Sequence, residues 1–355
     1  MKKVEQSSNT FTRRNFNKAL GSIALLGSLV AIPAYAVEKS DISIGIGPDW
    51  GTAGHAVIAL KKGYFEEEGL NVELKKFSAG LVQVEALASR DLDFAVPAQA
   101  PVFSLRSAGV PILFLSNAAI WGEALSLVVR PESNIKKPSD LIGKKIGVFK
   151  GSGAELMYRK ILELYDIDPK QVDAVGLKPP EQLSSMIAGL VDGIVVWEPW
   201  VQQAVDKANG IKVHTGGTSY FEGYEGKKAV VDWTRTVLVT LEPTVKKYPE
   251  TVDAVLRAFS RSQDFLTDPA NDEEAIALFS EFQGQEPELN RKLKPSFEFS
   301  MNLDEGFLDG MNQPLDFLEQ IGRIKKRVDV LDYTYTDPLA KARPDAVSIK
   351  SNYKP

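Results

Sequence analysis

The sequence predicts an α/β protein with two related lobes, each a mostly parallel sheet flanked by helices, joined by two crossing segments. Short apolar runs alternate with amphipathic stretches from residue 42 to residue 115, which is the pattern of a βαβαβ unit. The same alternation returns about a hundred residues later, between residues 146 and 197. The length of 355 residues also suits roughly two domains of ordinary size.

The first unit opens with Ile42-Ser43-Ile44-Gly45-Ile46, whose β-branched residues at alternating positions are typical of a strand. Amphipathic stretches and further apolar runs then follow one another along the chain. The expected strands span 42–46, 72–77, 93–97 and 112–115, and the expected helices span 55–62, 82–89 and 100–108.

The second unit repeats this plan, with expected strands at 146–149, 172–177 and 193–197 and expected helices at 154–164 and 183–189. The clearest echo relates residues 87–96 to residues 186–195. In both segments a helix pattern ends, an aspartate follows (Asp93 or Asp192), and a buried strand begins. The echo predicts two lobes of related architecture.

Two strand-like segments, 124–129 and 234–240, lie where the lobes are expected to exchange chain. Later helices are expected to pack on the first lobe, at 245–248, 251–266, 273–282, 287–292 and 304–321, and the tail from Tyr333 is expected to be loosely held. Lobe I is thus predicted to comprise residues 37–124 and 238–355, and lobe II residues 125–237.

The N-terminus has the pattern of a twin-arginine export signal. Arg13-Arg14 precedes an apolar run at 19–32, which is too short to span a bilayer, and Ala34-Tyr35-Ala36 resembles a cleavage site. We expect residues 1–36 to be removed by cleavage after Ala36 and the mature protein to reside in the periplasm.

Composition excludes several classes of function. The net charge is −5, and removing residues 1–36 takes away five basic and one acidic residue and leaves −9, so nucleic acid is not an expected partner. The absence of cysteine excludes disulfides, thiol catalysis and a cysteine-linked lipid anchor. The two histidines, His55 and His214, lie far apart, so a metal site is not expected. No cofactor is expected either, and the protein is expected to be a monomer.

The turn Gly151-Ser152-Gly153 is a candidate anion seat because it connects a predicted strand to a predicted helix. A helix N-terminus presents unpaired N–H groups and the positive end of the helix dipole, and glycine lets a ligand approach the backbone. In open α/β sheets, ligands bind beyond the carboxyl ends of the strands. All five tryptophans fall at such ends or at a crossing, and four have a carboxylate beside them: Trp50 with Asp49, Trp121 with Glu123, Trp197 with Glu198 and Trp233 with Asp232.

Several motifs together resemble the nitrate/sulfonate/taurine group of ABC-transporter solute-binding proteins, which is related to binders of thiamine-pyrimidine precursors. They are Gly63-Tyr64-Phe65, Glu68-Gly69-Leu70, Ala86-Leu87-Ala88, Asp93, the Gly151-Ser152-Gly153 turn and Val196-Trp197-Glu198-Pro199-Trp200. The resemblance covers residues 42 to about 249. It implies a type II periplasmic-binding-protein fold that closes by hinge motion on a small-molecule ligand, passes it to an inner-membrane permease and performs no chemistry.

The resemblance also implies roles for particular residues. Gly151, Ser152 and Gly153 would hold the anionic end of the ligand, and Trp121, Trp197 and Trp233 would enclose its apolar part. Contacts from the first lobe would come from Gly51, Thr52, Ala98 and Gln99. Trp50, Glu198 and Asp232 join the candidate ligand-binding residues because they lie at predicted strand ends or at a crossing. His55 is a further candidate, because it is expected to open a helix and to donate to an anion.

Two alternatives to a sulfonate- or taurine-like anion remain open at this level. The carboxylates beside the indoles would suit a neutral or cationic ligand, such as a pyrimidine or an amine. An exported pyrimidine-synthase-like enzyme using His55 as a base is the other, although that enzyme depends on a cysteine-rich motif and this chain has no cysteine.

Overall fold

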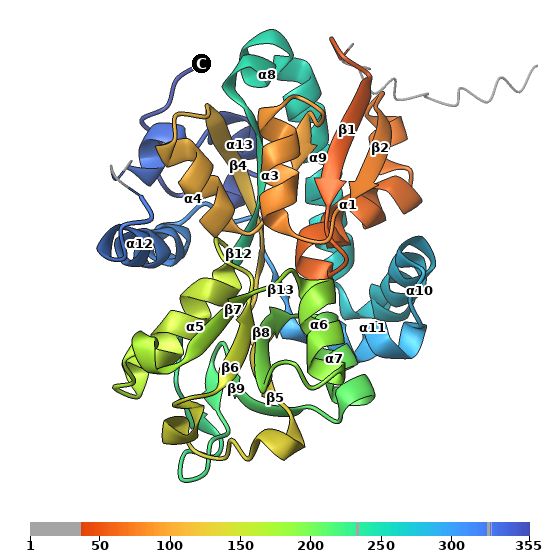
Figure 1. Ribbon diagram of the computed structural model, residues 1–355. Helices are drawn as coiled ribbons and strands as arrows, with labels where there is room; N and C mark the ends of the chain where they lie inside the picture. Colours follow the sequence, from red (N-terminus) through yellow and green to blue (C-terminus); the bar gives the residue numbers. More distant parts are fainter. Residues whose placement is uncertain (1–36, 232–233, 325–326, 328) are drawn as a thin grey trace, which may run out of the picture. The chain divides into compact units, whose positions relative to one another are not determined.

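Two β-sheets flanked by helices organise the chain in the computed structural model (Figure 1). The structure describes residues 37–355 except 232–233, 325–326 and 328. These residues belong to one compact unit, Tyr35–Pro355. The export signal predicted at residues 1–36 lies outside the described residues.

The first sheet has six strands in the order β13-β4-β12-β3-β1-β2. Their bounds are β1 (Asp41–Ile46), β2 (Asn71–Lys76), β3 (Phe94–Ala95), β4 (Ile112–Ile120), β12 (Arg235–Leu241) and β13 (Glu298–Phe299). Strand β1 is parallel to β2 and β3, whereas β12 is antiparallel to both β3 and β4.

The second sheet has seven strands in the order β11-β10-β9-β5-β8-β6-β7. Their bounds are β5 (Leu125–Val129), β6 (Lys145–Val148), β7 (Asp173–Gly176), β8 (Gly193–Trp197), β9 (Ile211–Thr215), β10 (Thr218–Ser219) and β11 (Lys227–Lys228). Strand β6 is parallel to β7 and β8, and β5 is antiparallel to both β8 and β9. The order β7-β6-β8-β5-β9 therefore repeats β2-β1-β3-β12-β4, which confirms the related architecture predicted from the sequence echo.

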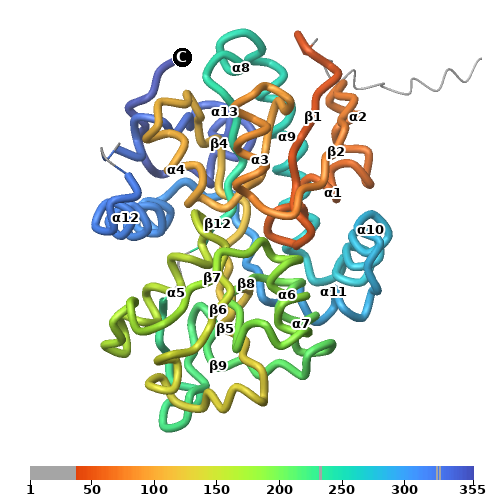
Figure 2. The backbone as a smooth tube through the Cα atoms, viewed as in Figure 1, coloured from red at the N-terminus to blue at the C-terminus, as the bar shows by residue number. Residues whose placement is uncertain are grey.

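Helices cover both sheets (Figures 1 and 2). The helices along the first part of the chain and after β12 are α1 (Trp50–Lys61), α2 (Tyr64–Glu67), α3 (Gly80–Ala88), α4 (Gln99–Ser107), α8 (Glu242–Lys247), α9 (Pro249–Thr267), α10 (Asp272–Gln283), α11 (Pro287–Leu293), α12 (Glu305–Gln320) and α13 (Asp337–Ala342). The second sheet is flanked by α5 (Gly153–Leu164), α6 (Pro179–Ile187) and α7 (Trp200–Ala208). Short 3₁₀ turns occur at η1 (Pro131–Ser133), η2 (Pro138–Leu141), η3 (Pro169–Gln171), η4 (Pro269–Asn271), η5 (Lys294–Ser296), η6 (Val330–Tyr333) and η7 (Pro344–Ala346). Within the described ranges, no helix is both long enough and apolar enough to cross a membrane.

The two aspartates of the sequence echo make equivalent hydrogen bonds in the two sheets. The Asp93 amide donates to the Ser43 carbonyl at 3.0 Å, and the Asp93 carboxylate accepts from the Ser43 amide at 3.0 Å. Asp192 forms the same pair with Lys145, at 2.8 and 2.9 Å. Each aspartate thus provides hydrogen-bond partners for the backbone N–H and C=O of one residue in β1 or β6. The neighbouring strand, β3 or β8, does not pair these two groups.

The two passages of chain between the sheets lie side by side. The first follows β4 and leads directly into β5, and the second leads from β11 into β12. The amide of Trp121 in the first passage donates to the carbonyl of Thr234 in the second at 2.9 Å. The two segments expected to cross between the lobes, 124–129 and 234–240, are strands as predicted, but each runs within one sheet, as β5 and β12, and the crossings are the passages that precede them.

Helix α1 begins at Trp50, five residues before the helix expected from the sequence. The side chain of Asp49 caps this helix by accepting a 2.8 Å hydrogen bond from the Thr52 amide. The expectation that His55 opens a helix is therefore wrong: His55 lies inside α1, away from its N-terminus.

The C-terminal tail is packed against the first sheet and not loosely held, so that prediction is also wrong. Tyr333 is 1% exposed, and the Tyr335 amide donates to the Phe114 carbonyl of β4 at 2.8 Å. Thr334 forms a parallel bridge with Phe114, and α13 packs on α9. Backbone pairing and aromatic burial hold this segment in place. These contacts produce no helical or strand periodicity in the sequence, so the sequence did not indicate them.

Candidate ligand-binding site

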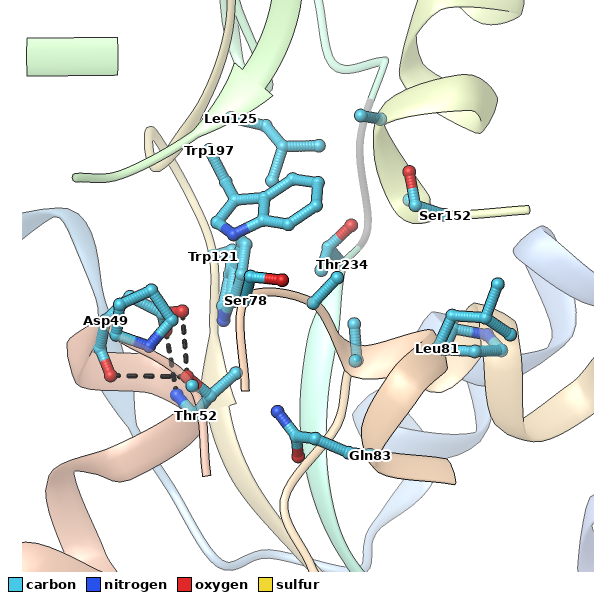
Figure 3. Close-up of a pocket in the computed structure, with 18 residues that line it drawn as sticks. Asp49, Thr52, Ser78, Leu81, Gln83, Trp121, Leu125, Ser152, Trp197 and Thr234 are labelled. Atoms are coloured by element: carbon cyan, nitrogen blue, oxygen red, sulfur yellow. Dashed lines mark hydrogen bonds between the residues drawn. The ribbon is translucent and has the colours of Figure 1, made fainter. Parts of the chain in front are cut away.

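A cavity lies between the two sheets and takes residues from both (Figure 3). It leaves about 450 Å³ of space between its walls, part of it open to solvent. Its lining residues are Gly47, Pro48, Asp49, Thr52, Ser78, Ala79, Gly80, Leu81, Gln83, Ala98, Pro101, Trp121, Leu125, Ser152, Gly153, Ala154, Trp197 and Thr234.

The N-terminus of α5 forms the wall on the side of the second sheet. Gly151, with φ +81°, turns the chain after β6, and Ser152 precedes the first helical residue. Among the described residues, the backbone N–H groups of Gly153 and Ala154 have no hydrogen-bond partner. These groups and the helix dipole make this wall a seat for an anion or another hydrogen-bond acceptor.

Glu155 fixes the geometry of this turn. Its carboxylate accepts from the Gly151 amide at 2.7 Å and from the guanidinium groups of Arg159 and Arg323. Burial opposes ionisation of Glu155, but these hydrogen bonds outweigh it and lower the pKa of the carboxyl. Ser152 Oγ donates to the Phe149 carbonyl at 2.6 Å and closes the same turn.

Gly153 is a position where a larger residue does not fit. A Cβ atom added there would fall 2.8 Å from Oγ1 of Thr234, which lies on the second passage between the sheets. The glycine therefore allows α5 to approach the crossing chain closely and keeps its first amide groups accessible to the cavity.

Asp49, Thr52 and Gln83 form a polar wall on the side of the first sheet. Thr52 donates to the Asp49 carboxyl from its amide and from Oγ1, each at 2.8 Å. Burial raises the pKa of Asp49 to about 7, although the hydrogen bonds from Thr52 oppose this shift. Gln83 is fully buried on α3.

Two indoles and several aliphatic residues close the remaining sides. Trp121 follows β4 and Trp197 ends β8, and their ring centroids lie 6.5 Å apart. Leu81, Pro101 and Leu125 complete this apolar surface. The cavity therefore combines free backbone donors on one wall, an opposing polar wall and apolar sides, an arrangement suited to a small organic solute.

Six of the residues predicted to bind a ligand line this cavity, namely Thr52, Ala98, Trp121, Ser152, Gly153 and Trp197. They come from five separate places in the sequence, and the fold brings them together. Two further predicted residues, Asp232 and Trp233, lie outside the described residues.

Three of the predicted residues stand directly behind the lining. Gly151 shapes the turn before α5. Gly51 lies under an indole, because a Cβ atom added there would fall 2.2 Å from Nε1 of Trp121. The Gln99 side chain accepts a 2.8 Å hydrogen bond from the Arg235 amide and lines a neighbouring hollow beside α12.

Three others are placed in the interior. The Trp50 ring stacks on Phe279 with centroids 3.8 Å apart. His55 hydrogen-bonds through Nε2 to the Gln263 side chain at 2.8 Å, and burial lowers its pKa to about 4. The Glu198 carboxyl accepts from the Gln202 amide, and burial raises its pKa to about 7.

The sequence alone points to Asp49 only as a neighbour of Trp50 and does not single out Gln83. Asp49 carried a usable signal, because Asp at a strand-to-helix turn is a preferred helix cap. The loop at Ser78 follows the carboxyl end of β2, where ligands bind in open α/β sheets, and the tryptophans were identified by the same criterion. Gln83 had no such signal, because its burial depends on how α3 packs.

The described residues hold no cluster of three or more His, Asp or Glu side chains that would suit a metal ion. No histidine is found among the described residues that line the cavity.

Residues 53–272, more than half of the chain, match the family model described as NMT1/THI5 like. The chain belongs to the NMT1/THI5-like family. Among curated relatives, the taurine-binding periplasmic protein of Escherichia coli K12 is 29% identical over 68% of this chain and 72% of its own length. A putative aliphatic sulfonates-binding protein of Bacillus subtilis 168 is 26% identical over 81% of this chain and 84% of its own.

A solved structure shows the same fold. The alkanesulfonate-binding protein SsuA of Xanthomonas axonopodis pv. citri, solved with MOPS, superposes with a TM-score of 0.70 at 18% identity, over 85% of this chain and all of its own. These comparisons confirm the predicted resemblance and the two-lobed periplasmic-binding-protein fold. All three of these relatives are named as binding proteins, not as enzymes.

Proposed function

We propose that this protein is the substrate-binding component of an ABC importer and captures a small organic anion, such as a sulfonate or a taurine-like compound, in the cavity between the sheets. The α5 N-terminus carries this proposal, because the amides of Gly153 and Ala154, unpaired within the described chain, face a cavity with indole sides. The names of the taurine- and sulfonate-binding relatives support the same class of ligand.

Capture is proposed to proceed by hinge closure of two lobes, residues 37–124 with 238–355 and residues 125–237. The hydrogen bond between Trp121 and Thr234 joins the two crossing passages at the level of the cavity, which is where such a hinge would act. Closure would bring the α5 seat toward the Asp49 wall and exclude water from the solute.

The proposed location is the periplasm. Residues 1–36 would direct the protein to the twin-arginine machinery and be removed after Ala36, and the mature monomer would deliver its ligand to an inner-membrane permease. The arginine pair, the short apolar run and the periplasmic relative from E. coli support this assignment.

A neutral or cationic ligand, such as a pyrimidine or an amine, is a second candidate. The observation in its favour is the Asp49 carboxyl, which lines the same cavity opposite the anion seat. The enzyme alternative lacks comparable support, because the His55 imidazole is bonded to Gln263 and lies outside the lining.

Titration calorimetry of the purified protein with taurine, propane-1-sulfonate, nitrate and an aminopyrimidine tests the proposal. Binding of a sulfonate is expected, and it should raise the free energy of unfolding by about 2.7 kcal/mol at a ligand concentration 100 times the Kd. Gly153→Ala is the matched variant: alanine suits a helix, but its Cβ would crowd Thr234, so affinity should fall at least about tenfold. No heat and no stabilisation with either sulfonate would contradict the proposed anion class, and an aminopyrimidine that binds alone would favour the second candidate.

A further inference from the structure

Gln83 is a buried polar side chain whose hydrogen-bonding groups are unused. It is 0% exposed and lines the cavity, and Figure 3 shows its amide end turned toward the side of Thr52. Among the described residues, neither its Nε2 nor its Oε1 has a hydrogen-bond partner. Buried amides in folded proteins are almost always paired, so a partner from outside the chain is indicated.

The internal repeat supplies a comparison. Gln182 is the fourth residue of α6, as Gln83 is the fourth residue of α3, and both helices follow the equivalent strands β7 and β2. Gln182 is equally buried, and its Oε1 also lacks a partner among the described residues, but its Nε2 donates to the Leu177 carbonyl at 3.1 Å, and it does not line the cavity. The fold therefore offers a backbone partner to the glutamine in the second lobe, whereas the one in the first lobe faces the ligand space.

The chemistry of this wall favours a ligand with N–H groups. The Asp49 carboxyl, the Thr52 hydroxyl and Gln83 Oε1 are acceptors, and the Thr52 hydroxyl hydrogen is already donated to Asp49. Among Asp49, Thr52 and Gln83, the only side-chain amide donor is Nε2 of Gln83. The opposite wall reverses this balance, because the free groups that Gly153 and Ala154 present there are donors.

We infer that the bound solute is bipolar and that Gln83, together with Asp49, recognises an N–H group at the end opposite its anionic group. This inference rests on the proposed function and narrows it: among small sulfonates, one that carries an amine or amide N–H is preferred to a plain alkanesulfonate. Gln83 is then a specificity-determining residue.

Calorimetric affinities of taurine and propane-1-sulfonate test the inference. The two probes have similar size, and a methyl group of the second replaces the ammonium group of the first. The wild-type protein should bind taurine at least about tenfold more tightly, because a site built for hydrogen bonds rejects an analogue that leaves them unpaired. Gln83→Leu should reduce this preference to less than about threefold, mainly by weakening taurine.

Gln182→Leu is the matched control, since it removes the equivalent buried amide at a position that does not line the cavity. It should keep the wild-type preference even if its stability falls. Circular dichroism and thermal melting of each variant would confirm that the binding measurements refer to folded protein.

The outcomes separate this inference from the proposed function. If the wild type binds both sulfonates with equal affinity, or if Gln83→Leu keeps the full preference for taurine, Gln83 meets only buried water and the inference is overturned while sulfonate binding stands. If neither sulfonate binds, the proposed function and this inference fall together.

Discussion

At the scale of single residues, the site depends on side chains whose environment changes their ordinary chemistry. Asp49 caps α1 and lines the cavity, yet it is buried against the neutral side chain of Thr52. Aspartate beside tryptophan is visible in the sequence, but the burial that alters its protonation is not. Gln83 shows the same limit more sharply, because a glutamine in an amphipathic stretch is usually a solvated residue.

Asp49→Asn should change how stability depends on pH. The pKa of Asp49 is about 7 in the folded chain against 3.8 when exposed, so the folded state retains a proton that the unfolded state releases. The contribution of Asp49 to the free energy of unfolding therefore falls as pH rises between about 4 and 7. An asparagine there still caps α1 and cannot ionise, so the variant should gain stability relative to the parent over this window, by at most about 4 kcal/mol.

Urea unfolding of the ligand-free parent and variant at several pH values between about 4 and 8 measures this difference. A difference that stays constant across the whole range would show that Asp49 titrates like an exposed carboxyl. Asp49→Ala is a useful second variant, because it should carry the same pH trend with an added loss of helix capping.

At the scale of secondary structure elements, the strands buried on both faces were the most predictable. Residues 193–197 were expected as a strand and form β8 with the same bounds, and the apolar run at residues 146–149 corresponds closely to β6. The two-residue strands β10, β11 and β13 leave no periodic pattern and were missed. The early start of α1 was missed because Trp50-Gly51-Thr52-Ala53-Gly54 lacks helical apolar spacing.

The internal repeat also predicts an effect at the turns that end two equivalent helices. Arg90 and Gly189 occupy equivalent positions after α3 and α6, and both adopt left-handed backbone, with φ +68° and +73°. Arg90 is exposed, so Arg90→Gly should raise the free energy of unfolding by roughly 0.5–1 kcal/mol by relieving backbone strain.

Gly189→Ala is the reciprocal variant. It should lower the free energy of unfolding by roughly 1–2 kcal/mol, because alanine is strained at a φ of +73°. Chemical denaturation of both variants provides the test. The two changes in the free energy of unfolding need not be equal in size. A lower free energy of unfolding for Arg90→Gly would contradict the role assigned to this turn.

At the scale of the whole described chain, the two-lobed plan was predictable because its pattern occurs twice in the sequence. The contacts that join the two halves were not, since they involve residues far apart in the chain. The ion pair between Glu155 of α5 and Arg323, which follows α12, is one such contact, with guanidinium-to-carboxylate distances of 2.9 and 3.0 Å. It ties the turn at Gly151 to the segment that follows α12, so the proposed anion seat is held from both halves of the molecule.

A crystal structure of the protein with bound taurine is the most direct measurement of the central claim, that the cavity between the sheets is the ligand site. We predict the sulfonate at the backbone amides of Gly153 and Ala154, between Trp121 and Trp197, with the amine directed to Asp49 and Gln83. Taurine bound elsewhere on the chain, with this cavity filled only by solvent, would contradict that claim.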